Sequence, residues 1–149
     1  MQFYSTNRKT SPVSLREAVV RGLAADRGLF MPEVIRRFPP AFYQNMKEMT
    51  LREISFVVAE AFFGEDVEAG KLKEIVDETL NFDIPLVQVA DNRYSLELFH
   101  GPTLAFKDVG ARFMARLLAY FNKQEGERQV NVLVATSGDT GSAVANGFL

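Results

Sequence analysis

The chain contains no cysteine and a single histidine, His100. Without cysteine it can form no disulfide, thiolate metal site or cysteine nucleophile, and one histidine excludes multi-histidine metal sites and most histidine proton shuttles within this chain. We therefore expect no metal site. Positive and negative charges nearly balance, with 17 Lys and Arg against 19 Asp and Glu, so neither nucleic acid nor an acidic membrane is an expected partner.

Long apolar runs are also missing from the sequence. No segment is long and apolar enough to span a bilayer, and the polar start Met1–Lys9 does not have the pattern of a signal peptide. We expect a cytoplasmic protein. The 149 residues are 47% hydrophobic and 24% charged, a balance typical of a globular chain that forms one ordinary domain or two small ones.

The first part of the chain has the pattern of a small, mostly helical domain over residues 1–82. Capping-box sequences at Ser14–Glu17 and Thr50–Glu53 each precede apolar residues at helical spacing, which predicts helices that end near Gly22 and Gly64. Two further helices are expected at about 41–47 and about 67–80.

From Ile84 onward the pattern changes to that of an α/β domain, which we expect to cover residues 83–149. Two extended runs, 85–90 and 93–99, flank a turn pair at Asp91 and Asn92 and predict a β-hairpin. A broad-faced helix is expected at 109–121, then a buried parallel strand at 130–135, and then another helix.

Lys107 stands at an unfavourable place for a solvated cation. It falls in or just before the first turn of the predicted helix, where the positive end of the helix dipole costs a cation about 0.3–1 kcal/mol. With Phe99, Leu104 and Phe106 around it, the amine is expected to be partly desolvated, which favours the neutral nucleophile that forms a Schiff base. The alternative is a surface lysine whose stem covers Phe106 and whose amine lies in water.

A hydroxyl-rich turn follows the predicted strand, Thr136-Ser-Gly-Asp-Thr-Gly-Ser142. Its glycines permit a tight turn, its hydroxyls donate hydrogen bonds, and the N–H groups at the next helix start favour a carboxylate or phosphate. It has neither the lysine of a P-loop nor the three-glycine spacing of a dinucleotide fingerprint. The alternative is a structural turn in which Asp139 caps the helix. An unpaired Asp139 would repel an anion, so we expect its carboxylate to face a donor.

These segments resemble the fold type II pyridoxal-phosphate enzymes, and within that superfamily the threonine synthase family. The superfamily resemblance lies in Ile84-Pro-Leu-Val, Phe-Lys107-Asp108 and Ser137-Gly-Asp-Thr-Gly141. Segments similar to the threonine synthase family follow one another along the whole chain: Phe3-Tyr-Ser-Thr6, Gly28-Leu-Phe-Met-Pro-Glu33, Leu98–Asp108, Arg112-Phe-Met114 and Ala135–Ala143. Arg27 stands where the family often has glycine. This difference puts in doubt a positive φ at that loop position, but it does not affect the expected chemistry.

The resemblance implies a fold, a reaction and roles for particular residues. The fold would be a helical N-terminal unit followed by the opening part (hairpin, helix, strand, helix) of a truncated fold type II open sheet. The reaction would convert O-phospho-L-homoserine and water to L-threonine and phosphate with pyridoxal 5'-phosphate, which Lys107 would bind covalently, with Phe106 and Asp139 beside it. The residues implied at the substrate carboxylate are Thr136, Ser137, Gly138, Thr140 and Gly141.

The family's later glycine-rich phosphate loop and its C-terminal partner for the pyridine nitrogen do not occur in these 149 residues. We therefore expect the N-terminal portion of such an enzyme, inactive alone and prone to self-association through an open sheet edge. Two alternatives stay open: another fold type II lyase or dehydratase, and a non-catalytic truncated module.

Overall fold

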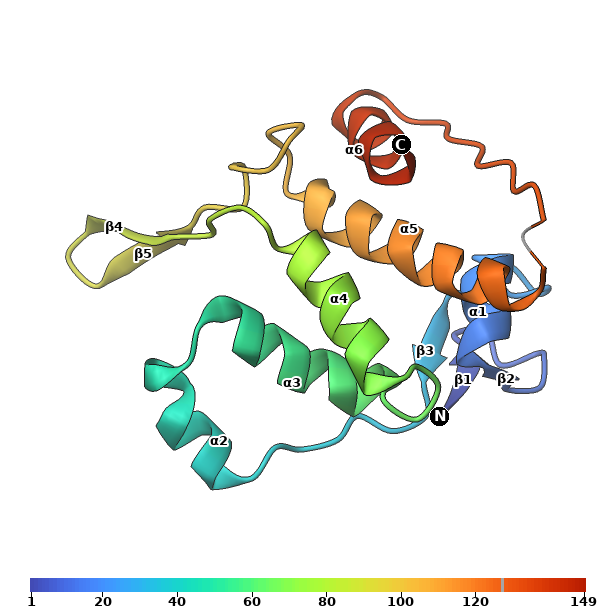
Figure 1. The fold of residues 1–149 in the computed structure, drawn as a ribbon, viewed down its shortest axis with the longest axis horizontal. Coiled ribbons are helices and arrows are strands. Elements are labelled where there is room, and N and C mark those ends of the chain that lie inside the picture. The colour runs from blue at the N-terminus through green and yellow to red at the C-terminus, as the bar shows by residue number, and fades with distance from the viewer. Residues whose placement is uncertain (127) are drawn as a thin grey trace. The chain divides into compact units, whose positions relative to one another are not determined.

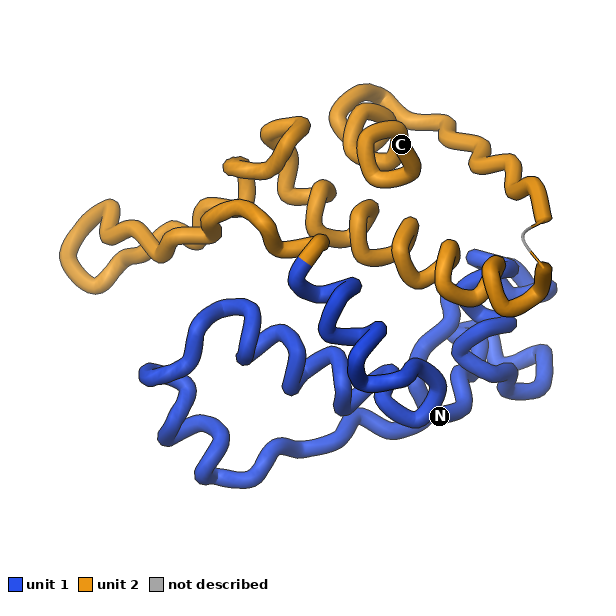
Figure 2. Tube along the Cα trace, in the orientation of Figure 1, with its two compact units in different colours: residues 1–77 blue, residues 78–149 orange. Residues whose placement is uncertain are grey.

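The computed structural model describes residues 1–126 and 128–149, which divide into two compact units (Figures 1 and 2). The first unit is Met1–Asp77 and the second is Glu78–Leu149. The chain is a mixture of helices and small sheets, as the sequence pattern predicted. The division lies within a helix, a few residues before the predicted boundary of the domains 1–82 and 83–149, and these domains stay a prediction.

A three-stranded antiparallel sheet forms the start of the first unit. Its central strand β1 (Gln2–Ser5) pairs with β2 (Val13–Ser14) on one side and with β3 (Phe30–Pro32) on the other. Pro32 lies on the edge strand, where a missing N–H costs little. The sequence pattern predicts a mostly helical unit here and does not reveal the sheet, because strands of two to four residues are too short to show an alternating pattern.

The helix α1 (Leu15–Arg21) begins and ends where the sequence predicted. The Ser14 hydroxyl accepts a hydrogen bond from the Glu17 N–H at 3.2 Å, and Gly22 terminates the helix with a left-handed φ of 71°. The Glu17 carboxylate instead pairs with Arg21 at 3.0 Å. At this helix start the structure therefore shows Ser14 as the cap and Glu17 turned toward the solvent-exposed face of its own helix.

The remaining helices of the first unit also agree with the predicted positions. A complete capping box begins α3 (Leu51–Phe63), since Glu53 accepts from the Thr50 N–H at 2.7 Å and donates its own N–H to the Thr50 hydroxyl at 3.3 Å. The other helices are α2 (Pro40–Asn45), a 3-10 turn (Met46–Glu48) and α4 (Ala69–Thr79), whose last residues enter the second unit. The buried apolar side chains include Phe3, Leu15, Val19, Ala59, Val67, Leu72 and Val76.

A buried serine and an aspartate close the loop that precedes β3. The Ser5 hydroxyl donates to the Asp26 carboxylate at 2.6 Å, and the N–H groups of Lys9 and Gly28 donate to the same carboxylate. The Ser5 hydroxyl, with help from these N–H groups, lowers the pKa of Asp26, although desolvation acts in the opposite sense. Arg27 has a φ of 65°, so the position where the family often has glycine is a left-handed one.

The second unit begins with the predicted hairpin. Strands β4 (Leu86–Ala90) and β5 (Arg93–Leu96) pair through a turn in which Asn92 has a left-handed φ of 56°. Leu86, Val89 and the other large side chains of the hairpin are exposed within the described residues. A lone two-stranded hairpin is marginally stable in water. An element that covered the exposed apolar side chains would therefore stabilise this hairpin.

Helices α5 (Lys107–Gln124) and α6 (Asp139–Phe148) pack against each other in the second unit (Figure 1). Ala143 is fully buried. A Cβ added at Gly147 would lie 3.1 Å from the carbonyl carbon and oxygen of Ala111, so the two backbones approach closely where α6 carries a glycine. The first residues of the two helices, Lys107 and Asp139, also approach each other, with 3.9 Å between amine and carboxylate, which brings the two sequence motifs of interest together.

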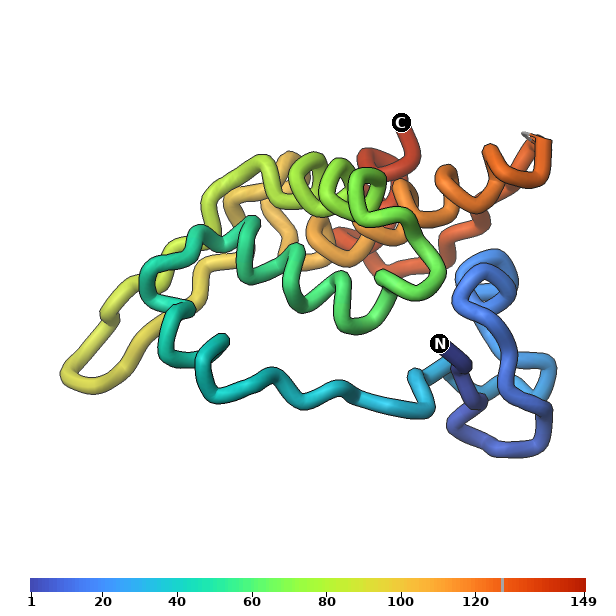
Figure 3. The backbone as a smooth tube through the Cα atoms, turned by 60° about the horizontal axis from the view of Figure 1, so that its bottom comes forward, coloured from blue at the N-terminus to red at the C-terminus, as the bar shows by residue number. Residues whose placement is uncertain are grey.

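The strand predicted at 130–135 is not formed in the described structure. The segment runs as an extended trace between α5 and α6 (Figure 3), with no strand assigned to it. Its side chains are exposed, to 94% for Leu133. A strand exists through ladder hydrogen bonds to a neighbour, and among the described residues β4 and β5 pair with each other only. The prediction of a buried parallel strand is therefore wrong for the described structure, because a strand needs a neighbouring strand to pair with.

Candidate active site around Lys107

Lys107 is the first residue of α5, in the first helical turn as predicted. Phe106 precedes it and supplies no side-chain cap. The Lys107 amine lies 4.6 Å from the centre of the Phe106 ring, and the lysine side chain is 35% exposed. Leu104 and Phe99 are exposed, Leu104 to 75%. The amine is therefore partly covered by its own neighbour, while the apolar side chains of Leu104 and Phe99 are exposed to solvent.

Asp108 is fully buried and faces the loop before α5. Its carboxylate accepts hydrogen bonds from the Thr103 N–H at 2.9 Å and from the Thr103 hydroxyl at 2.6 Å. A Cβ added at Gly101 would lie 2.5 Å from the Asp108 carboxylate and 3.0 Å from the Phe82 ring. The loop 101–106 can therefore fold back on the helix start because residue 101 has no side chain.

Arg112 anchors the same helix one turn further along. Its guanidinium donates to the carbonyl oxygens of Glu78 and Thr79, at 2.5 and 3.3 Å, and to the Asn81 amide oxygen at 3.0 Å. Carbonyl groups at the end of a helix have no intrahelical partner, so this cation caps the last turn of α4. The pKa of Arg112 is lowered, chiefly because burial removes the guanidinium from water, and the nearby Asp108 partly opposes this effect. Within this unit, α5 is thereby held to the residues that precede the hairpin.

The hydroxyl-rich segment differs from the predicted loop. The helix α6 begins at Asp139 with Gly138 as its cap, so Asp139, Thr140 and Gly141 lie in the first turn of the helix. Asp139 is a helical residue and not the cap that the alternative interpretation required. The Gly141 N–H donates to the Gly138 carbonyl at 2.9 Å, which uses one of the N–H groups expected to be free for an anion.

Other donors of this segment stay available. The Gly138 N–H reaches the Thr136 hydroxyl at 3.4 Å, a long hydrogen bond. Within the described residues, no hydrogen bond is formed by the side chains of Ser137 and Thr140. A Cβ at Gly141 would lie 2.8 Å from the Thr136 methyl group, so the glycine lets this threonine pack on α6. Free hydroxyls at a helix start are suited to a carboxylate or phosphate.

The structure brings Lys107 and this segment together. The Lys107 amine lies 3.9 Å from the Asp139 carboxylate, whose side chain is well exposed. The two groups form an ion pair, but the distance between them is too long for a hydrogen bond. The cation supplies the partner that the sequence analysis expected for Asp139. Two motifs that are far apart in the sequence thus form one cluster of an amine, a carboxylate and hydroxyl groups at the starts of α5 and α6.

His100 takes no part in this cluster through any hydrogen bond of the described residues. Its Nε2 atom lies 2.7 Å from the Glu97 carboxylate, and its ring packs on Phe99 at 4.7 Å between centroids. These contacts give the histidine a structural place in the loop. The sequence analysis missed a different feature, the hydrogen bonding of Asp108 to Thr103. The signal available was the glycine at 101, but spacing alone does not show which side chain approaches it.

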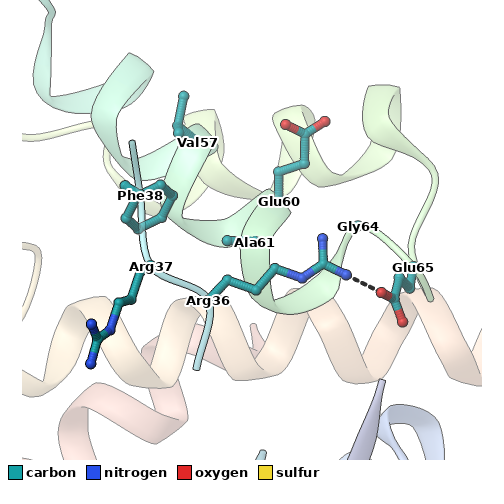
Figure 4. A pocket seen from close by; sticks show the side chains of 8 residues that line it. All are labelled: Arg36, Arg37, Phe38, Val57, Glu60, Ala61, Gly64 and Glu65. Atoms are coloured by element: carbon teal, nitrogen blue, oxygen red, sulfur yellow. Dashed lines mark hydrogen bonds and ion pairs between the residues drawn. The ribbon is translucent and has the colours of Figure 1, made fainter. Parts of the chain in front are cut away.

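Two hollows on the described surface contain few of the predicted site residues. One, of about 420 Å³, lies in the first unit between α3 and the segment that precedes α2 (Figure 4). There Arg36 pairs with Glu65, while Phe38 and Ala61 line the wall. The other, of about 460 Å³, lies in the second unit and is lined by Val132, Val134, Gly141, Val144, Ala145 and Phe148. Its lining is apolar, so it suits packing more than catalysis.

Fold and site together define an α/β protein in which a lysine at one helix start faces a hydroxyl-rich turn at another. Comparison with known proteins identifies its family. A family model described as "Threonine synthase N terminus" matches residues 2–80, more than half of the chain. The chain belongs to the threonine synthase family.

Individual relatives agree with that assignment. The chain is 41% identical over 148 residues to a threonine synthase of Serratia marcescens. Among solved structures it matches threonine synthase from Escherichia coli, with a TM-score of 0.90 at 38% identity, and PLP-bound threonine synthase from Brucella melitensis, with a TM-score of 0.89 at 35% identity. Each comparison covers 99% of this chain and 33–34% of the relative. The chain thus spans about a third of the length of these relatives.

Proposed function

We propose that this chain is the lysine-bearing part of a threonine synthase, which converts O-phospho-L-homoserine and water to L-threonine and phosphate. The observation that carries the proposal is the position of the Lys107 amine, 3.9 Å from Asp139 at the start of α6. An amine beside free hydroxyls and a helix start provides a nucleophile and an anion-binding surface in one place. The family assignment and the named relatives support this reaction over others.

Pyridoxal 5'-phosphate fits the residues present as the cofactor of this reaction. A primary amine is the group that reacts with its aldehyde carbon, with release of water, and the Lys107 amine is partly accessible at the edge of an aromatic ring. When bound, the cofactor supplies the electron sink for chemistry at the substrate carbons. We place Phe106 and Asp139 beside the cofactor. A PLP-bound structure of a relative supports the choice.

The chain's own residues would bind and orient the substrate and move protons. The amine of Lys107, once free of the cofactor, would accept and return a proton at the substrate carbons. The α6 start would hold the substrate carboxylate, with hydroxyl donors from the side chains and the field of the helix dipole. The residues assigned to this grip are Thr136, Ser137, Gly138, Thr140 and Gly141.

Reductive trapping tests the role of Lys107. Sodium borohydride reduction of the complete protein with pyridoxal 5'-phosphate, followed by peptide mapping, should find the cofactor on Lys107. Lys107→Ala should abolish both the label and turnover of O-phospho-L-homoserine. Lys123→Ala is the matched control, since Lys123 lies in the last turn of the same helix. Label on Lys123 or Lys71 in the unchanged protein would overturn the assignment.

The 149-residue chain alone is expected to lack turnover and to self-associate. It matches a third of each relative, and its hairpin and its 128–136 segment expose apolar side chains that favour association. Sedimentation and a cofactor titration on the purified chain check this expectation. A monomer that binds the cofactor tightly and releases phosphate would contradict it. A complete protein that turns over a different amino acid would favour another fold type II lyase or dehydratase.

A further inference from the structure

We propose that Asp108 and Thr103 are positioning residues for Lys107, and this inference rests on the proposed function of that lysine. The carboxylate of Asp108 and the N–H and hydroxyl of Thr103 form a clasp that holds loop 101–106 against the start of α5. The clasp sets where the Lys107 amine lies and how accessible it is. Asp108 and Thr103 flank the loop that leads into the lysine, and neither is proposed to touch the substrate.

The burial of Asp108 shows that its carboxylate serves this loop. The side chain is 0% exposed, and a buried charge persists when hydrogen bonds satisfy it. Among the described residues, both hydrogen bonds of this carboxylate come from Thr103, at 2.9 and 2.6 Å. A helix-start aspartate commonly stabilises its own first turn. Here it binds a residue five positions earlier, so its hydrogen bonds fix the path of the chain into the helix.

Gly101 lies so close to the same carboxylate that only a residue without a side chain fits there. An added Cβ would meet Asp108 Oδ2 at 2.5 Å and its Cβ at 2.9 Å. The Leu104 N–H donates to the Gly101 carbonyl at 3.0 Å, so the loop closes in a tight turn directly over the buried aspartate. Gly101 and Thr103 therefore both contact the carboxylate of Asp108, the residue that follows Lys107.

Leu104 shows that the clasp holds the loop in a costly conformation. Its φ is 57°, a left-handed value that a residue with a Cβ adopts only at a cost in free energy. Its side chain is exposed, so packing in the described structure does not offset this cost. Strain of this kind persists where surrounding contacts determine the backbone, and it is often found at active sites. The hydrogen bond from the Leu104 N–H to the Gly101 carbonyl closes this turn, and the two bonds from Thr103 to Asp108 tie it to the start of α5.

The consequence for Lys107 follows from its place in the chain. It is the neighbour of Asp108 and the first residue of α5, so a loop freed from Asp108 would let the helix start fray and the amine leave Phe106 and Asp139. The test uses the complete protein with Thr103→Val. This substitution removes the 2.6 Å hydrogen bond from the Thr103 hydroxyl to Asp108 and keeps the shape of the side chain. Thr103→Ser restores the hydroxyl and serves as the rescue variant.

A second hydroxyl–carboxylate pair in the chain offers a matched control. Ser5, a buried residue of the first unit, donates to Asp26 at the same 2.6 Å and also accepts from the Asn7 N–H at 3.2 Å, whereas Thr103 is half-buried. Ser5→Ala should lower the melting temperature as Thr103→Val does, because each variant removes one hydrogen bond to a carboxylate. Any effect on Lys107 that Thr103→Val shows and Ser5→Ala does not is therefore local to the clasp.

Three measurements test this inference, two of them without any cofactor. In hydrogen exchange, Thr103→Val should make the amides of residues 103–108 exchange about tenfold faster, the ratio expected for one lost hydrogen bond to a charged group. Acetylation of Lys107, followed by mass spectrometry, should become faster in the same variant. With pyridoxal 5'-phosphate present, borohydride-trapped label on Lys107 should form more slowly. Thr103→Ser and Ser5→Ala should match the unchanged protein in all three.

The outcomes separate this inference from the proposed function. If Thr103→Val leaves exchange, acetylation and cofactor trapping unchanged, or if Ser5→Ala alters them equally, the clasp does not position the lysine. If the unchanged protein never traps the cofactor on Lys107, the proposed function fails. The acetylation and exchange measurements still decide then whether Asp108 and Thr103 control the lysine amine.

Discussion

The amine of Lys107 lies 3.9 Å from the carboxylate of Asp139, across the starts of two packed helices. The distance is too long for a hydrogen bond, and the exposed carboxylate makes this a weak ion pair. The pair matters for its position more than for its energy. It joins the lysine loop and the hydroxyl-rich turn into one candidate site, and it gives Asp139 a cation that can reduce its repulsion of a bound anion.

The first prediction concerns the substrate carboxylate. Thr140→Val removes a hydroxyl at the α6 start, which leaves a charged acceptor short of a donor at a cost of about 1.5–3 kcal/mol. The Michaelis constant for O-phospho-L-homoserine should rise about tenfold or more, while cofactor affinity stays unchanged. Steady-state kinetics and a cofactor titration measure the two effects. Ser142→Ala, on the same helix but outside the assigned set, should behave as the unchanged protein; equal losses in both variants would contradict the assignment.

The second prediction concerns the close approach at Gly101. Gly101→Ala forces a Cβ to within 2.5 Å of the buried Asp108 carboxylate, and overpacking of this kind costs about 1–3 kcal/mol. Urea unfolding should show the loss. Gly110→Ala is the control, because a Cβ there meets nothing within 4 Å among the described residues. In that helical position alanine should raise stability by about 1 kcal/mol, so two glycine-to-alanine changes in one unit should have opposite signs.

The third prediction concerns the left-handed residue of the first unit. Arg27 has a φ of 65°, which costs a residue with a side chain about 1–2 kcal/mol. Arg27→Gly removes this cost but gives the unfolded chain more freedom, worth about 0.4–1 kcal/mol. We expect a net gain in the free energy of unfolding of up to about 1 kcal/mol. Arg21→Gly, at the last residue of α1, removes a good helix former and the ion pair with Glu17 and should lower the free energy of unfolding by up to about 1 kcal/mol. A loss in both variants would show that the arginine side chain at 27 matters more than its backbone.

The fourth prediction concerns acid unfolding. The pKa of Asp26 is lowered from its ordinary value of 3.8, chiefly by the Ser5 hydroxyl. A carboxyl whose pKa is lower in the folded state adds stability above the unfolded pKa, and this stability is lost as the pH falls through the folded value. Unfolding followed by circular dichroism from neutral pH downward should therefore show a loss that begins near pH 3.8. Asp26→Asn should weaken the dependence of stability on pH in this range. If the variant loses stability as steeply as the unchanged protein, Asp26 is not the group responsible.

Helices and their ends were predictable because their signals are local. The capping box at Thr50 and the stop at Gly22 act within one turn of the chain, and the structure has both. The hairpin turn at Asn92 was equally visible, since two residues determine it. The strands of the first sheet were missed because two to four residues show no period. The turn predicted at 136–142 extends too far, since α6 begins at Asp139, because glycines and hydroxyls in a first helical turn look like a loop.

The sequence by itself determined the family, the order of the helices and the residues capable of the chemistry, since motifs and caps depend on neighbours along the chain. The tertiary structure decided three other matters. It showed that Lys107 meets Asp139, that Asp108 turns back to Thr103, and that the run at 130–135 stays unpaired among the described residues. Each depends on groups distant in sequence or on backbone direction, and spacing along a chain does not specify which distant atoms approach one another.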